Sequence, residues 1–510
     1  MNSSTAFRTS ASELGGGRIL ILLLLFILAI YQFVNAGFSA FATICSFPII
    51  VLVMILAFKK HIYVFWTLVL INAFLQWHSI SLPSAIPMSM YNEGLEMLLI
   101  AMAIIDAKDY HFNRCANLMM FALGIWCLFC MLEILNDTCG MGVDIAAWYQ
   151  GTRMLALQML YAFIVFSLYI NTPNILIRYL FIWGAIALFA SFWVWKQSNI
   201  GFTHPEEVWL NGAGRVTHII QGGTLIRYFS IYSDAANFGI GIASTAVAFI
   251  IFGITSKILK YKIFFFITGA AAAWATFPSG TRTAIACLII GFIAYIFLSK
   301  SVKIAVPFTI LFGLFVFMLA FTDIGQGNQQ IRRMRSAFDK DDASANVREI
   351  NQAAMRKYMK EAPWGLGVGL YHTNIPANNK YFFVVNTPSD SEYVSIWVRT
   401  GKIGLIVFLI TTAIMLIGAC RIVLFKLKSP SLRGIGAGLC CAFVSQQLGG
   451  YGNMVLMQFP NCLFFYGGLT IVYILPLMEN EWIIFEEKKL AAQKEKKILR
   501  LKKKQGLHVQ

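Results

Sequence analysis

Charged residues are scarce in this sequence: Asp, Glu, Lys and Arg together make up only 13% of 510 residues. Soluble globular domains carry about 25%. Hydrophobic residues reach 58% and gather in long runs. Because lipid offers the backbone no hydrogen bonds, such runs cross a membrane as α-helices. The composition therefore excludes a soluble enzyme and predicts an all-α, polytopic membrane bundle.

Recognisable metal and nucleotide sites are also lacking. The ten cysteines lie mostly inside apolar runs and show neither metal-ligand spacing nor a disulfide framework. Asp339, Asp341 and Asp342 are candidates for a divalent ion, but a solvated acidic turn around Lys340 is the favoured interpretation. The glycines of 363–369 follow no strand and precede no Lys-Ser/Thr pair, so a nucleotide-binding loop is not expected. We therefore expect neither a metal nor a cofactor.

Acidic residues are few, with 24 Asp and Glu against 41 Lys and Arg, and the net charge is +17. Nine of the basic residues lie between Lys488 and Lys504. A basic tail indicates contact either with anionic lipids or with nucleic acid. No nucleic-acid-reading module is attached to it, so we expect membrane lipids as its partner and no nucleic acid.

The apolar runs predict about fourteen spans, which leave one large polar segment uncovered. The spans fall near 19–35, 39–58, 62–77, 93–105, 115–135, 154–170, 175–195, 236–254, 263–277, 283–299, 302–321, 403–424, 434–449 and 459–477. The fourth is short, and Met88 is an alternative start for it. The expected organisation is a bundle of spans 1–11 at 1–321, a loop at 322–402, spans 12–14 at 403–478 and a basic tail at 479–510.

Lys and Arg in short loops mark the cytoplasmic side. With both termini in the cytoplasm, Lys59, Lys260, Lys300 and Lys428 all fall inside. The regions 136–153, 196–235, 278–282 and the long 322–402 loop then lie outside.

The long loop is expected to be folded. Asn346 and Glu349 have the spacing of a helix-capping box, and Pro363 ends the pattern. An apolar stripe follows at helical spacing and predicts an amphipathic helix on the outer membrane face; it comprises Val347, Ile350, Ala354 and Tyr358. The glycines at 365–369 let backbone approach backbone, or backbone approach substrate.

Arginines are the strongest chemical signal on the outer side. Arg227 enters the eighth span, where a snorkelling anchor is an equally good interpretation. Arg282 lies in a tight turn between two spans, where an unpaired charge is costly and therefore a functional candidate. Guanidinium groups match phosphate oxygens with forked donors. Together with Arg348 and Arg356 they predict a diphosphate site that needs no metal.

Three motifs resemble the O-antigen ligase and O-antigen polymerase superfamily of membrane glycosyltransferases. They are Arg227 followed by Ser233-Asp234-Ala235-Ala236-Asn237-Phe238, the turn Ser279-Gly280-Thr281-Arg282-Thr283, and Pro363-Trp364-Gly365-Leu366-Gly367-Val368-Gly369 followed by Tyr393-Val394 and Thr400-Gly401-Lys402-Ile403-Gly404. Arg356 and Gly367 also have an Arg-x10-Gly spacing seen in polymerases. The resemblance covers roughly Arg227 to Ile410.

The resemblance implies that a glycan linked to a polyprenyl diphosphate is passed to an acceptor hydroxyl at the outer leaflet. The family arginines correspond to Arg227, Arg282 and either Arg348 or Arg356. Family ligases have a histidine where Asp390 stands here.

The remaining candidates carry other roles. Asp390 and Glu392 are candidate bases, or alternatively favourable charges at a helix N-terminus. The candidates for substrate binding comprise Arg348, Arg356, Asp234, Asn237, Gly367 and His372, the last being the only histidine of the long loop.

The first interpretation is a polymerase of lipid-linked repeat units of a surface polysaccharide, such as O-antigen, capsule or exopolysaccharide. A ligase that moves glycan to lipid A-core or another acceptor is the alternative. A lipid-linked oligosaccharide flippase is a further one, although such proteins commonly show two similar halves. For each, the expected location is the bacterial inner membrane.

Overall fold

The computed structural model describes residues 59–80, 88–220, 225–300, 343–504 and parts of 306–335. It divides into two compact units, Met1–Thr67 and Leu68–Gln510. Of the first unit it describes 59–67, which contain the start of a helix. The predicted spans at 19–35 and 39–58, most of the span at 302–321, and Asp339, Asp341 and Asp342 lie outside the described residues.

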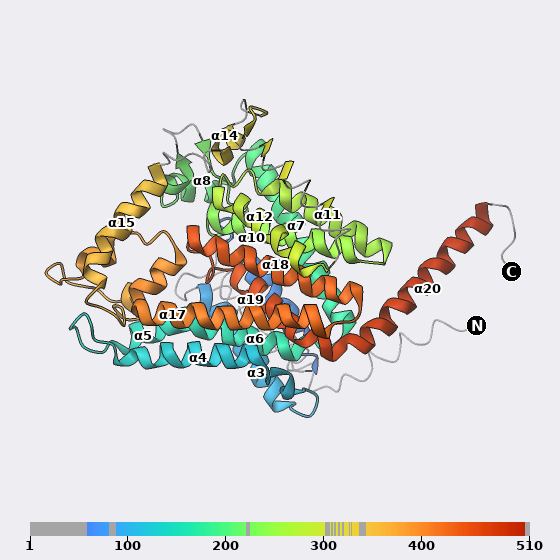
Figure 1. The fold of residues 1–510 in the computed structure, drawn as a ribbon, viewed down its shortest axis with the longest axis horizontal. Helices are drawn as coiled ribbons and strands as arrows, with labels where there is room; N and C mark the ends of the chain where they lie inside the picture. The colour runs from blue at the N-terminus through green and yellow to red at the C-terminus, as the bar shows by residue number, and fades with distance from the viewer. Residues whose placement is uncertain are drawn as a thin grey trace, which may run out of the picture. The chain divides into compact units, whose positions relative to one another are not determined.

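The described part of the chain is almost entirely helical (Figure 1). Its first half contains α2 (Ile62–Phe74), α3 (Met88–Ile105), η1 (Phe112–Cys115), α4 (Leu118–Leu132), η2 (Glu133–Leu135), α5 (Ile145–Thr152), η3 (Arg153–Leu157), α6 (Gln158–Tyr169), α7 (Pro173–Asn199), α8 (His204–Asn211), α9 (Arg215–His218), β1 (Ile219–Ile220) and β2 (Leu225–Ile226). Its second half contains α10 (Ala235–Thr255), α11 (Leu259–Ala275), α12 (Arg282–Leu298), α14 (Gln329–Arg335), α15 (Ala343–Met359), η6 (Leu370–His372), α16 (Phe382–Asn386), α17 (Glu392–Arg421), η7 (Ile422–Lys426), α18 (Pro430–Gly452), α19 (Asn461–Ile474), η8 (Leu475–Met478) and α20 (Glu479–Lys504).

The predicted all-α membrane fold is confirmed. Seven helical stretches among the described residues are long and apolar enough to cross a membrane, and α2 and α12 are shorter apolar helices. Eleven of the fourteen predicted spans coincide with helices, namely α2, α3, α4, α6, α7, α10, α11, α12, α17, α18 and α19. The total of fourteen stays a prediction, because the other three spans lie largely outside the described residues.

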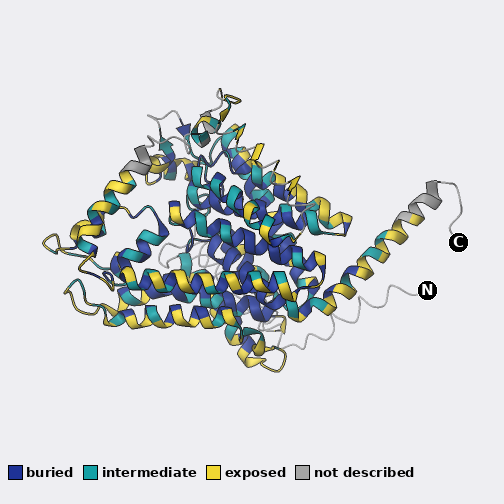
Figure 2. Ribbon diagram, viewed as in Figure 1, coloured by how far each residue is buried: buried dark blue, intermediate teal, exposed yellow. Residues whose placement is uncertain are grey.

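The buried centre of the second unit is formed by α10, α18 and α19 (Figure 2). Helix α10 packs against α11, α12 and α18, while α19 packs against α6 and α18. The long helix α17 runs beside α4 (Figure 1). Helices at the centre can be apolar all round, whereas α4 and α17 leave apolar side chains such as Leu128 and Ile410 exposed, as expected of surfaces that face lipid.

Buried polar contacts tie two of the helices together. The carboxylate of Glu93 on α3 pairs with Arg153 Nη1 at 3.2 Å and accepts a hydrogen bond from Gln158 Nε2 at 2.9 Å. Arg153 opens η3, a π-helical turn between α5 and α6. A charge placed in an apolar bundle is tolerated when it is paired in this way.

Residues 355–398 contain a hydrophobic cluster of their own, so the predicted folding of the long loop is confirmed. Helix α15 differs from expectation at its start. It begins at Ala343, one turn before Asn346, so the predicted cap at Asn346 is wrong; Ala343 and Ala345 favour helix and extend it. Of the predicted apolar stripe, Tyr358 packs against the cluster beside Met355 and Met359, whereas Val347 and Ile350 are exposed. The contact of the stripe with the membrane face stays a prediction.

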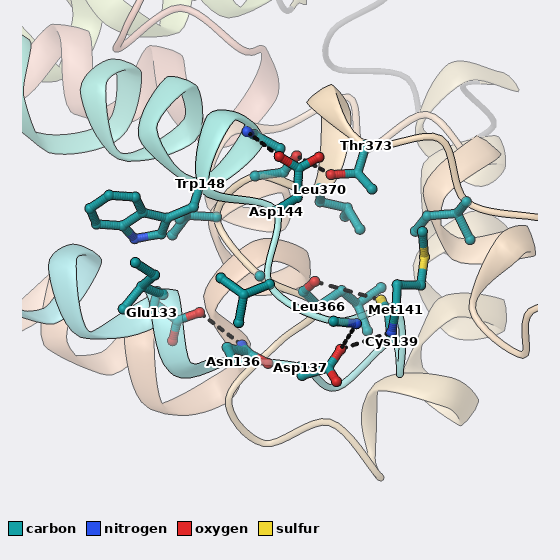
Figure 3. Close-up of a pocket in the computed structure, with 18 residues that line it drawn as sticks. Glu133, Asn136, Asp137, Cys139, Met141, Asp144, Trp148, Leu366, Leu370 and Thr373 are labelled. Carbon is teal, nitrogen blue, oxygen red and sulfur yellow. Dashed lines mark hydrogen bonds between the residues drawn. The ribbon is translucent and has the colours of Figure 1, made fainter.

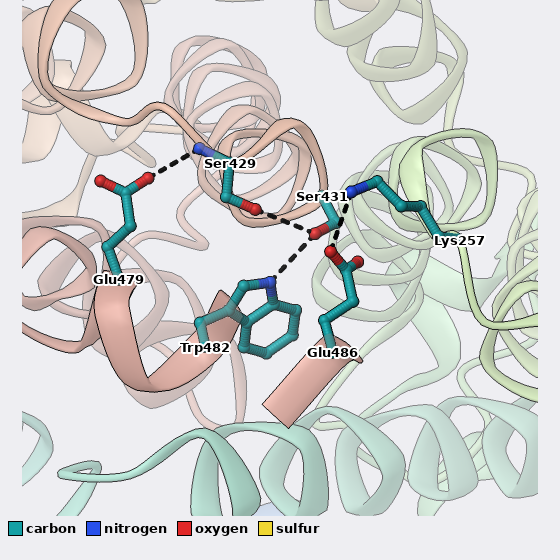
Figure 4. A network of polar contacts seen from close by, with 6 residues as sticks. All are labelled: Lys257, Ser429, Ser431, Glu479, Trp482 and Glu486. Carbon is teal, nitrogen blue, oxygen red and sulfur yellow. Dashed lines mark hydrogen bonds and ion pairs between the residues drawn. The ribbon is translucent and has the colours of Figure 1, made fainter. Parts of the chain in front are cut away.

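Helix α20 is attached to the bundle by a polar network (Figure 4). Glu486 pairs with Lys257 at 2.9 Å, and Trp482 Nε1 donates to Ser431 Oγ at 3.0 Å. Glu479 Oε1 accepts from the backbone amide of Ser429 at 2.7 Å. All of these contacts join segments that the charge distribution predicts on the cytoplasmic side.

Candidate functional site

A cavity of about 660 Å³ lies among the segments that the sequence predicts outside the membrane. It falls within the roughly 300–1,000 Å³ range of ligand pockets. Four of the predicted site residues line it together: Arg227, Asp234, Arg348 and Asp390. Arg399 and His218, which the sequence analysis did not single out, line it as well.

Arg227 follows strand β2 and is held by three neighbours. Its Nη1 donates to the Thr217 carbonyl at 3.0 Å, and its Nη2 donates to Thr281 Oγ1 at 2.9 Å. A Cβ added at Gly280, where φ is 58°, would lie 3.1 Å from Arg227 Cγ, so the turn must carry glycine to approach so closely. Nε of Arg227 is buried and finds no hydrogen-bond partner among the described residues. Burial lowers the pKa of the Arg227 guanidinium. The positive charges of Arg282 and Arg348 lower this pKa further, whereas the negative charge of Asp234 raises it and partly offsets these effects.

Two further arginines adjoin this position. Arg282 begins α12 directly after the turn, is partly buried, and lies near Arg348 and Arg227 without lining the cavity. Nε of Arg333, on α14, donates to the Gly280 carbonyl at 2.6 Å. Burial, and then Arg227 and Arg282, lower the pKa of Arg333 to about 10. The positive charges therefore converge strongly enough to destabilise one another, which an anion would relieve.

The two acidic residues in the cavity wall differ in what they bind. Asp234 caps α10, because its Oδ1 accepts from the amides of Ala236 and Asn237 at 2.8 and 2.9 Å. Asp390 is half-buried in a left-handed conformation with φ of 50°, which Asp tolerates better than most residues. Within the described residues, its carboxylate accepts no hydrogen bond. Asp390 is therefore the carboxylate available to a ligand.

His218 is a structural contact in the cavity wall. Its Nε2 accepts from the Ala235 amide at 2.9 Å, which leaves Nδ1 to carry the proton toward the Gly214 carbonyl at 3.1 Å. Burial, and next Arg227, lower its pKa to about 4. A neutral imidazole with both nitrogens engaged does not serve as a general base.

Besides Arg282, five of the predicted site residues do not line this cavity. Glu392 is buried, and its Oε2 accepts from the Leu456 amide at 3.0 Å, so it stabilises the start of α17. Asn237 is buried and joins α10 to the Phe459 carbonyl at 2.7 Å. Arg356 and His372 are exposed at the surface of the loop, and Gly367 lines a different pocket.

That second pocket encloses about 60 Å³ where 133–148 meets 366–375 (Figure 3). Asn136 Nδ2 donates to Glu133 Oε2 at 2.8 Å and to the Trp364 carbonyl at 3.0 Å. Cys139 Sγ contacts the Leu366 carbonyl at 3.6 Å. The space is small, and the residues of its walls hydrogen-bond to each other. These contacts therefore join two segments that the sequence predicts outside the membrane, rather than hold a substrate.

The glycine-rich run packs against a kink in α17. Gly401 has φ of 68°, and a Cβ added at Gly365 would lie 2.3 Å from its nitrogen. The Gly367 amide donates to the Arg399 carbonyl at 2.9 Å. The predicted close approach of backbone to backbone is confirmed, and it fixes Arg399 at the cavity.

Arg399 is the main site residue that the sequence analysis missed. It is 7% exposed, and its guanidinium carbon lies 4.5 Å from the centroid of the Tyr371 ring. One signal in the sequence could have revealed it: Arg399 lies just before an apolar run, and a charged residue next to a membrane span is a functional candidate. The predicted span began at 403, whereas α17 begins at Glu392, so Arg399 was assigned to the loop.

Comparison with known proteins agrees with the motifs. Residues 263–409 match the family model described as O-antigen ligase. The resemblance to the O-antigen ligase and polymerase superfamily is thus confirmed over this segment. The segment is less than a third of the chain; it includes Arg282, Arg348, Asp390 and Arg399, but not Arg227. No curated protein matches the chain.

The match supports a membrane glycosyltransferase of the ligase or polymerase type. Among the described residues, no group of three or more His, Cys, Asp or Glu side chains could hold a metal ion.

Proposed function

We propose that this protein is a glycosyltransferase that polymerises repeat units of a surface polysaccharide carried on polyprenyl diphosphate, such as undecaprenyl diphosphate. One observation carries the proposal: Arg227, Arg348 and Asp390 line the same cavity. Within the described residues, the Asp390 carboxylate accepts no hydrogen bond. Such a cavity offers forked donors for a diphosphate and an acceptor for a proton.

The arginines act on the donor substrate. Arg227 and Arg348 hold the diphosphate from the cavity wall, Arg282 beside them supplies a further forked donor, and Arg333 adds positive charge. Guanidinium groups bind phosphate oxygens through paired hydrogen bonds. Fixed donors stabilise the charge that develops on the leaving diphosphate as the glycosidic bond breaks.

Asp390 acts on the acceptor. An acceptor hydroxyl loses its proton to the Asp390 carboxylate, and its oxygen forms a bond with the anomeric carbon of the donor sugar. The bond from that carbon to the diphosphate oxygen breaks, and polyprenyl diphosphate leaves with the electron pair. A carboxylate that accepts no hydrogen bond from the described residues around it is suited to general-base catalysis of this kind.

A ligase remains the second candidate, because the matched model is described as O-antigen ligase. Its acceptor would be lipid A-core of lipopolysaccharide or another molecule. The polymerase is preferred because family ligases have a histidine at the position where this chain, by resemblance, has Asp390.

The proposed location is the bacterial inner membrane, with both termini in the cytoplasm and the cavity outside. The grouping of the loops supports this topology. The cavity is lined by segments predicted outside, whereas the network of α20 joins segments predicted inside. The basic residues of α20 would then meet anionic membrane lipids.

The test uses purified protein with a lipid-diphosphate glycan. Growth of longer lipid-linked chains from this substrate alone supports the polymerase. A product that forms only after a second acceptor is added indicates a ligase. Transfer across the membrane without any chemical change indicates a flippase and overturns both enzymes. Asp390→Asn should abolish turnover while pyrophosphate binding persists, and Asp109→Asn, at an exposed position, serves as the matched control.

A further inference from the structure

We propose that Arg399 forms a second anion subsite, which binds an acidic group, a carboxylate or a phosphate substituent, on the glycan itself. The inference rests on the proposed function, since it assumes that the arginines around Arg227 hold the lipid diphosphate. It adds the chemical class of sugar that the cavity accepts.

Arg399 is buried, yet its guanidinium has few partners of its own. It lines the cavity and lies over the face of Tyr371, and in the part of the chain that the structure describes its Nε has no hydrogen-bond partner. Within the described residues, Arg399 forms no ion pair and its side chain donates no hydrogen bond. A cation removed from water in this way is costly unless an anion accompanies it. The cavity is where such an anion would lie.

Glu392 does not fill that role. Its charge acts on Arg399, but no ion pair joins the two within 4 Å. Its carboxylate is oriented instead toward the backbone, where Oε2 accepts from the Leu456 amide at 3.0 Å. Glu392 therefore moderates the charge of Arg399 without occupying its donors.

Arg399 and Arg227 are held by different elements. The Arg399 carbonyl accepts from the Gly367 amide at 2.9 Å, and its side chain rests on η6 through Tyr371. Arg227 is held by Thr217 and Thr281. The cavity thus has two independently fixed cationic points. A diphosphate needs only one of them, and the other faces space that the sugars would occupy.

The experiment measures binding to purified, full-length protein by calorimetry, with methyl glucuronide, glucose 6-phosphate, neutral methyl glucoside and inorganic pyrophosphate as probes. We expect at least one acidic sugar to bind about tenfold or more tightly than methyl glucoside, as one charge-assisted pair allows. Glucuronide binding assigns a carboxylate, and binding of glucose 6-phosphate alone assigns a phosphate. Arg399→Gln should remove this preference and leave pyrophosphate binding within about twofold. Arg227→Gln should do the reverse.

Tyr371 provides a variant that does not depend on a buried charge, because its side chain is 37% exposed. Tyr371→Leu should weaken acidic-sugar binding by a few fold, roughly the effect of one cation–π contact, while Tyr371→Phe should leave it unchanged. Equal binding of acidic and neutral sugars overturns the inference, and so does loss of pyrophosphate binding in Arg399→Gln. Failure of pyrophosphate to bind the wild-type protein, with Arg399-dependent binding of an acidic sugar intact, overturns the proposed diphosphate site instead.

Discussion

Arg227 donates a hydrogen bond from Nη2 to Thr281 Oγ1 at 2.9 Å, and this hydroxyl gives its own proton to the Ala235 carbonyl at 2.8 Å. Two motifs separated by more than fifty residues in the sequence therefore meet at one side chain. A hydroxyl has one proton, so donation to Ala235 leaves its lone pairs toward the guanidinium. Thr281 orients Arg227.

Replacing Thr281 with valine tests this relationship. Thr281→Val keeps the shape but removes the hydroxyl that accepts from Arg227 Nη2, and a buried polar group that loses its partner costs about 1–3 kcal/mol. We expect kcat/KM to fall by about tenfold or more, equivalent to ~1.4 kcal/mol of transition-state binding. Thr281→Ser retains the hydroxyl and should stay near wild type. Equal losses in the two variants would remove the orienting role.

The substitution Arg282→Lys tests the fork of a guanidinium against simple charge. A membrane anchor needs only charge and reach, which Lys supplies, whereas a phosphate ligand needs planar paired donors. We expect normal membrane insertion and a loss of turnover on the order of a hundredfold, consistent with one transition-state donor at ~3 kcal/mol. Arg215→Lys, at an exposed position in a segment predicted outside the membrane, is the control and should be neutral. Full activity in Arg282→Lys would make Arg282 an anchor.

Hydropathy predicted the described helices well because a segment that crosses lipid must form all its backbone hydrogen bonds within itself, as a helix does. It predicted ends less well. Helix α17 begins eleven residues before the expected 403, since the polar turns from Glu392 to Arg399 are stabilised by contacts with the 453–458 segment and the glycine-rich run. Those contacts are long-range, and no local pattern reports them.

The site shows the same division. Arg227, Arg348 and Asp390 meet in one cavity, and the sequence singled them out because an arginine or an acid near a motif, in a segment predicted outside the membrane, needs an explanation. Glu392 and Asn237 lie in or beside the same motifs, but their side chains bond to backbone groups more than sixty residues away. Which polar residue lines the cavity depends on packing between distant segments, and the sequence does not record it.

Cysteine accessibility tests the proposed topology. Single cysteines replacing Lys260 or Lys428 should react only with membrane-permeant reagents, and those replacing Gly212 or Asn378 should also react with impermeant ones. All four positions are exposed, whereas Gly280 is buried and unsuitable. Labelling of Asn378→Cys from the cytoplasm alone would contradict an outer-leaflet donor site.

Chelation tests the charge that neutralises the leaving group. If Arg227, Arg348 and their neighbours hold the diphosphate, its negative charge is offset by guanidinium groups alone. Activity should then survive excess EDTA without loss. Inactivation that Mg²⁺ or Mn²⁺ reverses would assign the role to acidic residues, and untreated protein in matched buffer is the control.

The last prediction concerns pH and His218. Its folded-state pKa of about 4 lies below the ordinary 6.5, because burial first and Arg227 second disfavour the imidazolium, while Asp234 partly opposes them. Between these values the unfolded chain binds a proton that the folded chain does not, so acidification favours unfolding. Thermal stability contributed by neutral His218 should therefore be present above 6.5 and be lost progressively as the pH falls toward 4. His78, which lies over Trp209 nearby, also has a pKa lowered by burial and adds to the same slope.

The variant His218→Gln separates the two histidines. Glutamine offers an acceptor to the Ala235 amide and a donor to the Gly214 carbonyl, but it does not titrate in this range. Its Tm should fall less steeply between pH 6.5 and about 4 than that of the wild type, whatever its absolute value. His204→Gln, at an exposed position on α8, should keep the wild-type slope. An unchanged slope in His218→Gln would show that His218 is protonated normally in the folded protein, and its hydrogen bond from Ala235 would then have to be absent.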